Sequence, residues 1–377
     1  RGIDVLYHYT VGDNPERLRD TLTRALAETD LVITSGGLGP TQDDLTKEII
    51  AETAGRPLVQ DAKALDMLTK AFERFRREIT ENNYKQTYLP EGAEIFYNEV
   101  GTAPGFALEW DGRIVIALPG PPRELIHLFE TWVAPYLERR ADSVIYYRVL
   151  RCYGIGESAL ETELRDLIDG QTDPTIATYA KEGECTVRIA SKRRTRAEAE
   201  EAVAAMEARI GERVGAFVYS DADEDLADVV ARKLVERGLT VACAESCTGG
   251  LFASSLIGYP GISAVFDRGW VTYSNASKEE ELGVGTVAEY GAVSEETAIA
   301  MAQGVRERTG AAVCVSVTGI AGPDGAVADK PAGMAWICVI FEGNVSTKRV
   351  QTLNRGRNLN RQAFVLAMMD LINKTIG

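Results

Sequence analysis

Apolar positions in residues 1–140 alternate between short continuous runs and stretches with helical spacing. Residues 3–7 and 31–34 are predicted to be strands, the second of them buried, and the Asn14-Pro15 pair predicts the start of a helix between them. A further helix is expected from about Asp43. This alternation is typical of an α/β domain, so residues 1–142 are predicted to form a doubly wound, mostly parallel sheet with helices on both faces.

Beyond this point the pattern predicts a charged helical stretch at residues 58–85, two or three short strands within residues 92–118, and a helix that ends near Leu137. The pattern then changes. The next predicted strands are residues 144–153 and 186–192, and the next predicted helices are residues 157–169 and 195–211. Residues 143–217 are therefore expected to form a small α+β domain, and the polar residues 218–224 a linker.

Residues 225–377 have the pattern of a third, α/β domain. Apolar residues at helical spacing predict a helix from about Leu226 to Gly238, and a strand at residues 239–244 then runs into the sequence ESCTGG, after which another helix is expected. The remaining predicted elements are strands at residues 265–273, 311–317, 333–341 and 345–352 and a closing helix at residues 358–374.

Composition narrows the class of protein. The chain has 377 residues, of which 45% are hydrophobic and 26% charged, and this is typical of a soluble globular protein with two or three domains. No apolar run approaches the ~18 residues of a membrane span, and no signal peptide opens the chain. The free thiols expected below indicate a reducing compartment, so a cytoplasmic location is expected. The net charge of −15 argues against general binding to nucleic acid.

Cysteine and histidine restrict the possible chemistry. The six cysteines show no CxxC pair and no zinc-site spacing, so we expect buried free thiols. The two histidines are His8 and His127. A serine–histidine–aspartate triad, a cysteine–histidine dyad and a histidine-bound metal are thus excluded after residue 127. A hydrolytic site in the C-terminal half must take its base from lysine, tyrosine or a carboxylate.

A glycine-rich turn follows the predicted strand at residues 31–34. Its exposed N–H groups and the dipole of the next helix can hold a phosphate, and its candidate residues are Gly36, Gly37, Gly39, Thr41 and Asp44. Asp43 and Asp44 could hold a divalent cation or act on an anhydride bond. The alternative is a tight strand–helix turn with a favourable acidic first helical turn.

The sequence GGLGPTQDDLT of this turn resembles the phosphate-pocket segment of the molybdopterin-binding domain family, in the form found in the competence/damage-inducible CinA family. Residues 82–86, 98–105 and 118–125 match further segments. The resemblance implies an ADP-ribose pyrophosphatase-like activity that uses a divalent metal ion. Family members normally begin with another strand, a Gly-Thr-Glu-type loop and a helix, so this chain is expected to lack one sheet strand and part of the pocket, and to have little of that activity.

Residues 151–158 resemble the start of the family's KH-like middle domain. A KH module that binds nucleic acid needs a GxxG loop in a basic setting, and this segment has neither. A structural or dimerising role is therefore expected for the middle domain, and a homodimer for the protein.

Three predicted strand ends in residues 225–377 carry polar groups, and open α/β sheets bind ligands at such ends. The first end carries Ser246 and Cys247, and the second leads to Asn275 and Lys278, which lie one helical turn apart. The third opens into a Gly/Pro loop at residues 317–325. The alternatives are that Ser246 only caps a helix, that Lys278 is a solvated surface lysine, and that Cys247 is the nucleophile.

These segments are similar to the CinA C-terminal domain over its full length, and that family hydrolyses the carboxamide of nicotinamide mononucleotide to nicotinic acid mononucleotide and ammonia. The resemblance implies that Ser246 is the nucleophile and Lys278 the base, with Tyr273 beside them. A base of this kind needs a lysine pKa lowered by burial or by nearby positive charge. The implied substrate-binding residues are Thr248, Gly249, Asn275, Thr318 and Gly319. No cofactor is expected for this domain.

Two arginines near the end of the chain complete the resemblance. The family usually reads Gly-Asp-Arg-x-x-x-Arg where residues 355–361 here read RGRNLNR, so the aspartate is missing while Arg357 and Arg361 keep the spacing. Residues four apart share a helix face, and the pair can grip a phosphate. Two other functions stay open. One is a non-catalytic nucleotide-sensing or scaffold protein in competence or DNA-damage responses, and the other is pterin binding by the N-terminal domain.

Overall fold

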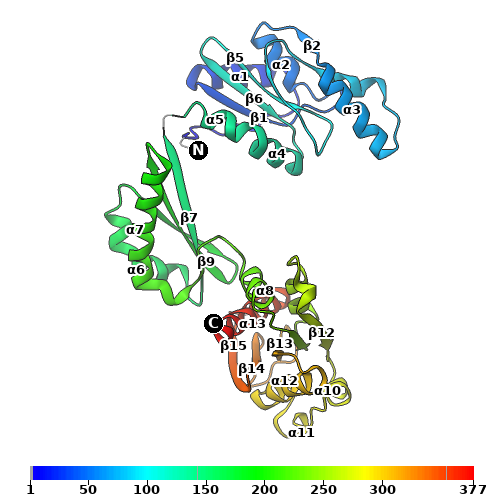
Figure 1. The fold of residues 1–377 in the computed structure, drawn as a ribbon, viewed down its shortest axis with the longest axis vertical. Helices are drawn as coiled ribbons and strands as arrows, with labels where there is room; N and C mark the ends of the chain where they lie inside the picture. Colours follow the sequence, from blue (N-terminus) through cyan, green and yellow to red (C-terminus); the bar gives the residue numbers. More distant parts are fainter. Residues whose placement is uncertain (1–2, 142, 354) are drawn as a thin grey trace. The chain divides into compact units, whose positions relative to one another are not determined.

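The computed structural model describes residues 3–141, 143–353 and 355–377. The chain divides into two compact units, one made of residues 1–145 with 192–196 and the other of residues 146–191 with 197–377. Both combine helices and sheets (Figure 1), and the predicted α/β class is confirmed.

The N-terminal unit contains a four-stranded sheet in the order β1-β6-β5-β4. Its strands are β1 (Leu31–Ser35), β6 (Arg113–Leu118), β5 (Gly105–Trp110) and β4 (Glu94–Phe96). The pair β1–β6 is parallel and the other two pairs are antiparallel, so the sheet is mixed where a mostly parallel one was predicted. The reason is the two-residue turn Asp111-Gly112 between β5 and β6, which only antiparallel neighbours can use.

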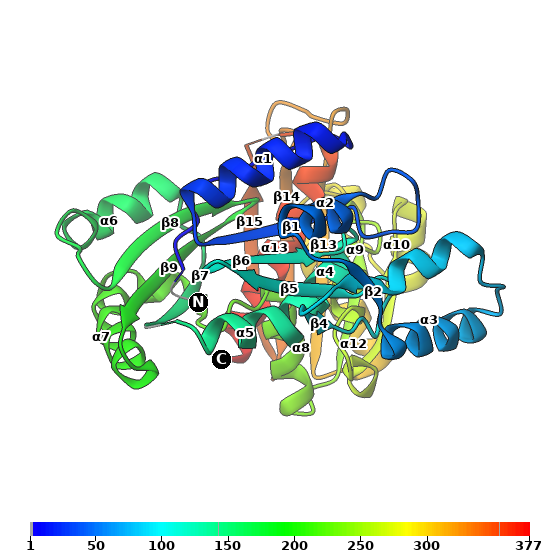
Figure 2. The same cartoon turned by 90° about the horizontal axis from the view of Figure 1, so that it is seen from above.

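Helices cover both faces of this sheet. They are α1 (Pro15–Glu28), α2 (Thr46–Thr53), α3 (Ala62–Phe75), α4 (Pro122–Leu128) and α5 (Ala134–Glu138), with a 3₁₀ helix at Glu81–Thr87 and a π-helical turn at Phe129–Val133. Leu22 and Ile50 pack in one core and Leu128 and Tyr136 in another, and Figure 2 shows α1 and α5 on opposite sides of the strands. A separate strand pair is formed by β2 (Leu58–Gln60) and β3 (Tyr88–Pro90).

Several predictions for this unit were wrong in detail. Residues 3–7 form no strand, and Val5 and Leu6 are 71% and 65% exposed, because no strand in the described part of the chain pairs with them. The helix expected from Asp43 begins at Thr46. Residues 58–85 contain β2, α3 and part of a 3₁₀ helix in place of one long helix, and β1 is only partly buried.

The middle domain is a four-stranded sheet in the order β10-β7-β9-β8, with both of its helices packed against one core. Its elements are β7 (Val144–Tyr153), α6 (Glu157–Asp169), β8 (Thr175–Lys181), β9 (Glu184–Arg193), α7 (Arg196–Val214), a 3₁₀ turn (Gly215–Phe217) and β10 (Val218–Ser220). Strand β8 was not predicted. Strand β10 pairs with β7, so the segment expected to be a linker begins as a sheet strand.

The C-terminal domain is built on a five-stranded sheet in the order β12-β11-β13-β14-β15. Its elements are α8 (Leu226–Glu236), β11 (Val241–Glu245), α9 (Leu251–Ile257), a 3₁₀ turn (Ile262–Ala264), β12 (Phe266–Val271), α10 (Asn275–Leu282), α11 (Val287–Tyr290), α12 (Glu295–Thr309), β13 (Val313–Ile320), β14 (Met334–Phe341), β15 (Asn344–Gln351) and α13 (Arg357–Ile376). Strand β11 is parallel to both β12 and β13, so the carboxyl ends of three strands meet at one edge.

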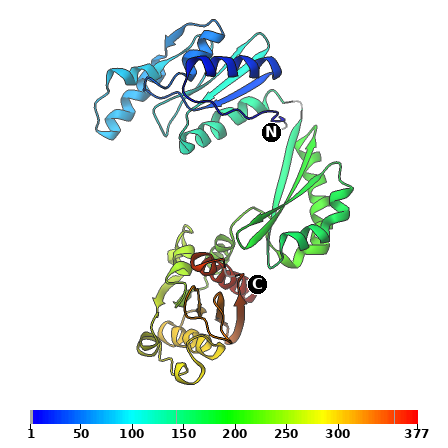
Figure 3. The ribbon, with the colours of Figure 1, turned by 180° about the vertical axis from the view of Figure 1, so that it is seen from behind.

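Helices pack on both faces of this sheet as well. Residues of α8, α9 and α13 share one core with the strands, and residues of α10 and α12 share the other. Figures 1 and 3 show the red helix α13 and the yellow helix α12 on opposite sides of the strands. All six cysteines are free and buried, as predicted. Among the described residues, none of the helices has both the length and the apolar character that crossing a membrane requires.

Candidate active site

A tight turn after β11 presents Ser246 at the edge of the C-terminal sheet. The Ser246 N–H donates to the carbonyl of Val317 on β13 at 3.1 Å, and the Gly249 N–H donates to the Ser246 carbonyl at 3.1 Å. The turn needs positive backbone angles at Gly249 (φ 62°) and Gly250 (φ 92°), which side chains other than glycine rarely adopt. Strand β11 is buried along its length, so the serine is carried by a rigid element.

Lys278 reaches this serine from helix α10. The helix begins behind the Ser274 side chain, which accepts the N–H of Ser277 at 3.0 Å, and this orients its first turn toward the sheet edge. Lys278 is 1% exposed. Its Nζ lies 3.1 Å from Ser246 Oγ and 2.8 Å from the Thr272 carbonyl oxygen. The structure thus brings together the two residues that the sequence assigned as nucleophile and base.

The surroundings of Lys278 shift its proton affinity downward. Burial lowers the pKa of Lys278 below its ordinary value, because an ammonium group loses its hydration there. A lysine without its proton can accept one from a serine hydroxyl. Of the two causes anticipated for a lowered pKa, burial is the one that operates.

Cys247 is adjacent to Ser246, the candidate nucleophile, and its thiol is held in the protonated, unreactive form. The side chain is buried, and burial raises the pKa of the Cys247 thiol to about 12. At neutral pH the group is therefore a thiol, and the thiolate is the nucleophilic form. The environment disfavours the alternative in which Cys247 attacks the substrate.

Two arginines at the start of α13 tie the strand ends together. Arg361 donates from Nη2 to the Thr248 carbonyl at 2.6 Å. Arg357 donates to the Gly322 carbonyl and to the Tyr273 hydroxyl, each at 2.8 Å. Both guanidinium groups therefore lie over the candidate site, on the helix face that the four-residue spacing predicted.

The other predicted pocket residues occupy less direct positions. The Thr318 hydroxyl donates to the Ala292 carbonyl at 2.5 Å, so it holds the segment before α12. At Gly319 a Cβ atom would lie 2.6 Å from Ala335 Cβ, which explains the glycine by the close approach of β14. Asn275 is exposed at the first position of α10. A role of these three residues in substrate binding stays a prediction.

Glu245 was not identified from the sequence. It is 1% exposed, and its carboxylate accepts the N–H groups of Gly250, Phe252 and Ala253 at 3.1, 3.0 and 2.9 Å. These donors belong to the start of α9, so the Glu245 carboxylate occupies N–H groups that a helix N-terminus otherwise offers to an anion. An acidic residue a few positions before a helix start was the signal available, since such residues favour helix N-termini.

Asn360 was missed as well. It is buried on α13 between the two arginines, where its amide donates to the Ala321 carbonyl at 2.9 Å and its oxygen accepts from the Thr352 hydroxyl at 2.7 Å. These bonds fix the loop after β13 against α13. A polar residue between two arginines gave no signal in the sequence that it would be buried.

The predicted N-terminal phosphate loop has a different construction. A Cβ atom at Gly37 would lie 2.1 Å from Thr46 Oγ1, and its φ is 71°, so only glycine fits where the loop meets α2. At Gly39 a Cβ atom would lie 2.5 Å from Asp44 Oδ2, whereas at Gly36 there is open space and φ is 96°. Asp44 Oδ2 accepts the Thr41 N–H at 2.9 Å and the Thr41 hydroxyl at 2.6 Å.

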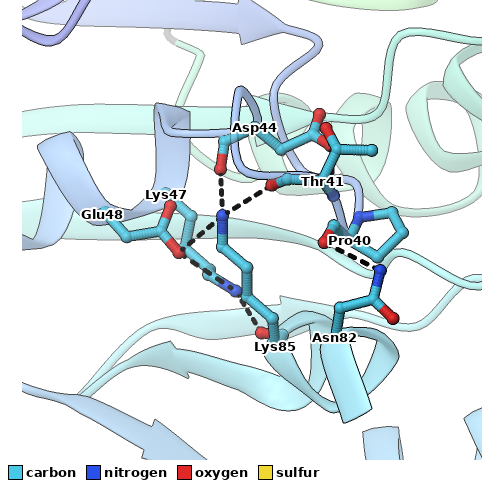
Figure 4. A network of polar contacts seen from close by, with 7 residues as sticks. All are labelled: Pro40, Thr41, Asp44, Lys47, Glu48, Asn82 and Lys85. Atoms are coloured by element: carbon cyan, nitrogen blue, oxygen red, sulfur yellow. Dashed lines mark hydrogen bonds and ion pairs between the residues drawn. The ribbon is translucent and has the colours of Figure 1, made fainter. Parts of the chain in front are cut away.

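Lys85, whose role sequence reasoning did not identify, donates to this loop, and Lys47 donates in turn to the main chain of Lys85 (Figure 4). Lys85 Nζ donates to the Thr41 carbonyl at 3.1 Å and to the Asp44 carbonyl at 2.5 Å, and lies 3.6 Å from Glu48 Oε1. Lys47 Nζ donates to the Lys85 carbonyl at 2.5 Å. Burial lowers the pKa of Lys47 to about 8.

The carboxylates expected to hold a metal ion do not form a ligand set. Asp43 is exposed, and Asp44 is engaged with Thr41. In the part of the chain that the structure describes, no three His, Cys, Asp or Glu side chains gather as metal ligands. Metal dependence of the N-terminal domain therefore stays a prediction from resemblance, and no chemical step is derived through a metal.

Comparison with known families divides the chain into three matched regions. Residues 1–139 match the family described as "Probable molybdopterin binding domain", residues 147–220 the "Damage-inducible protein CinA KH domain", and residues 223–376 the "CinA C-terminal domain". The breaks between these matches fall near the changes in sequence pattern.

Relatives span nearly the whole chain. A "CinA-like protein" of Dictyoglomus turgidum is 45% identical over 99% of this chain and 91% of its own length. Another of Dictyoglomus thermophilum is 43% identical with the same coverage. Among solved structures, the competence/damage inducible protein CihA from Agrobacterium tumefaciens is 42% identical, covering 39% of this chain and 93% of its own, with a TM-score of 0.38.

Proposed function

Because this chain belongs to the CinA family, we propose that its C-terminal domain hydrolyses the carboxamide of nicotinamide mononucleotide to nicotinic acid mononucleotide and ammonia. The observation that carries the proposal is the 3.1 Å contact between buried Lys278 Nζ and Ser246 Oγ. A buried lysine whose pKa is lowered, beside a serine on a rigid turn, is the arrangement that nucleophilic catalysis without histidine requires.

The proposed reaction runs through an acyl-enzyme. Neutral Lys278 takes the proton of the Ser246 hydroxyl while Oγ attacks the carboxamide carbon and forms a tetrahedral oxyanion. Lys278 then returns the proton to the amide nitrogen, the carbon–nitrogen bond breaks, and ammonia leaves. Water attacks the Ser246 ester with Lys278 again as base, which releases the carboxylic acid and restores the hydroxyl.

Arg357 and Arg361 supply the charge for the substrate's phosphate in this proposal. Each guanidinium donates to a carbonyl oxygen at the rim of the site and keeps further N–H groups for other acceptors. Charge-assisted contacts to phosphate would hold the nucleotide while its amide lies at Ser246.

The direct test incubates the purified 377-residue chain with nicotinamide mononucleotide and measures ammonia and nicotinic acid mononucleotide together. Equal amounts of the two products, released by the parent and lost in Ser246→Ala, are expected. A parent that binds the nucleotide and releases no ammonia contradicts the proposal and favours the non-catalytic nucleotide-sensing or scaffold alternative.

Asp43 and Asp44 do not lie in a cluster of metal-binding side chains among the described residues, so the structure adds no support to an N-terminal pyrophosphatase activity. Cleavage of ADP-ribose that disappears in Asp44→Ala is the experiment that would establish it. Competition between nucleotides and a pterin for the N-terminal domain would test the pterin-binding alternative.

A further inference from the structure

The turn that carries Ser246 contains two main-chain N–H groups, those of Cys247 and Thr248, that donate to no backbone carbonyl in the described part of the chain. Cys247 and Thr248 are 6% and 0% exposed. The buried Thr248 hydroxyl also has no partner there. Leaving a buried donor unpaired costs ~1–3 kcal/mol, so such groups usually have a functional reason.

The neighbouring donors, in contrast, are all occupied. The Gly249 N–H donates back to the Ser246 carbonyl, and the Leu251 N–H donates to the Thr248 carbonyl at 3.4 Å. The remaining donors at the start of α9 go to the carboxylate of Glu245, which is buried directly before the nucleophile. Glu245 thus decides which N–H groups of this region remain available.

We propose that Glu245 is a positioning residue for the amide hydrolysis proposed above, on which this inference rests. Its carboxylate binds the first turn of α9 and holds the intervening turn so that the Cys247 and Thr248 N–H groups are the donors to the oxyanion. The Gly249 N–H is not among these donors, because it already has an acceptor in the Ser246 carbonyl. Two aligned N–H groups are the usual means of stabilising a tetrahedral intermediate.

The main chain of Glu245 is also linked to Lys278, the proposed base, through Thr272. Its carbonyl accepts the Thr272 N–H at 2.9 Å, and the Thr272 carbonyl accepts Lys278 Nζ at 2.8 Å. A shift of Glu245 would therefore move the donors on one side and the support of Lys278 on the other. The same buried residue aligns both halves of the catalytic pair.

Glu245→Gln tests this inference with almost no change in volume. The amide can accept with one atom only, and its NH₂ group would point at an N–H donor, so the turn must relax. We expect kcat for nicotinamide mononucleotide to fall ~10²-fold with little change in KM, the size expected when an oxyanion donor is misaligned.

Asp370→Asn is the matched control, because it removes another buried carboxylate of the same domain, one that accepts from Lys348 and Lys374 on the far part of α13. Its kcat should stay within about twofold of the parent. If both variants lose kcat equally at equal loss of stability, Glu245 has only a structural role and the inference is wrong.

Binding of an analogue of the tetrahedral intermediate further distinguishes a positioning role of Glu245 from a purely structural one. The aldehyde analogue of the substrate can form a tetrahedral adduct with Ser246, whereas the product acid cannot. Glu245→Gln should weaken binding of the aldehyde by about the same factor by which it lowers kcat. Its affinity for the product acid should stay unchanged. Equal weakening of both ligands overturns the inference.

A measurement on the parent protein keeps the inference testable if the variant does not fold. Binding of the aldehyde should slow hydrogen exchange of the Cys247 and Thr248 amides and leave that of Phe252, already bonded to Glu245, unchanged. No slowing at Cys247 and Thr248 overturns the inference. A parent that releases no ammonia overturns the proposed function as well, whereas an active parent with a fully active Glu245→Gln overturns the inference alone.

Discussion

Each of the two glycine-rich turns of this protein is contacted by a lysine, and the two lysines have different partners. Lys278 faces the hydroxyl of Ser246, a group that can lose its proton and react. In the N-terminal domain Lys85 and Lys47 donate to main-chain carbonyls of Thr41, Asp44 and of Lys85 itself. The comparison teaches that the acceptor, more than burial or a lowered pKa, separates a lysine that can catalyse from one that holds a loop.

The largest expected effect lies in the Ser246–Lys278 pair. Ser246→Ala, Lys278→Met and the double variant should share one low kcat, reduced by at least ~10³-fold, because residues that act as a unit are non-additive. Steady-state ammonia release measures this. Cys247→Ala should keep most of the activity. Losses that simply multiply in the double variant would show that the two residues act independently, and an inactive Cys247→Ala with an active Ser246→Ala would assign the nucleophile to the thiol.

The next effect concerns the arginines above the same site. Arg357→Ala and Arg361→Ala should each raise KM for the mononucleotide by roughly 10- to 150-fold, since a hydrogen bond to a charged group contributes ~1.5–3 kcal/mol. KM for the dephosphorylated riboside should change little. Arg306→Ala, an exposed arginine of α12, serves as control and should match the parent. Equal losses on both substrates would refute phosphate binding.

The N-terminal lysines should show the opposite behaviour, with loss of stability and no effect on ammonia release. Lys85→Met leaves two carbonyl oxygens of the loop without their donor and should lower the free energy of unfolding of the N-terminal domain by ~1.5–3 kcal/mol, measured by urea titration. Lys70→Met, which removes an exposed pair with Asp66, should cost less than ~1 kcal/mol. A fall in ammonia release in Lys85→Met would break the comparison.

A further effect is in the pH dependence of stability, which Lys278 and Lys47 should share. Because burial lowers the pKa of both Lys278 and Lys47, the unfolded chain binds more protons than the folded one between the folded pKa and the unfolded value of ~10.4. The free energy of unfolding contributed by each lysine therefore rises with pH through that window, which for Lys47 begins at about 8. In each Lys→Met variant, the increase in the free energy of unfolding with pH that the replaced lysine contributes should be absent.

Activity should follow only one of these titrations. The kcat/KM for the mononucleotide should increase with pH as Lys278 loses its proton, and Lys47→Met should leave that limb in place. A limb that shifts in Lys47→Met, or an activity that falls as pH rises through the window, would contradict the assignment of Lys278 as base.

Much of the fold could be predicted because local signals agreed with the final packing. Asn14-Pro15 marks the start of α1, where the Asn14 side chain caps the helix, and the strands of the C-terminal sheet lie close to their apolar runs. The pairing of strands was harder. The Asp111-Gly112 hairpin signal was present and was not used, and the apolar pattern at residues 3–7 could not reveal whether a partner strand exists.

The site divides in the same way. Ser246 and Lys278 could be predicted to meet because both follow strand ends, and parallel strands bring such ends together. Glu245, Lys47 and Lys85 could not be assigned, since their partners are fixed by how separate segments pack and not by spacing along the chain. From the sequence alone, these charged residues cannot be distinguished from ordinary solvent-exposed ones.

Because all six thiols are buried, their chemical labelling can report partial unfolding of the protein. Cys152 and Cys185 lie in the middle domain, whereas Cys243, Cys247, Cys314 and Cys338 lie in the C-terminal one. A thiol that is shielded and holds its proton reacts slowly with maleimides or disulfide reagents, so modification must wait for the chain to open. Mass spectrometry of briefly labelled protein should then show steps of two or of four adducts, and the size of the step would tell which domain has opened.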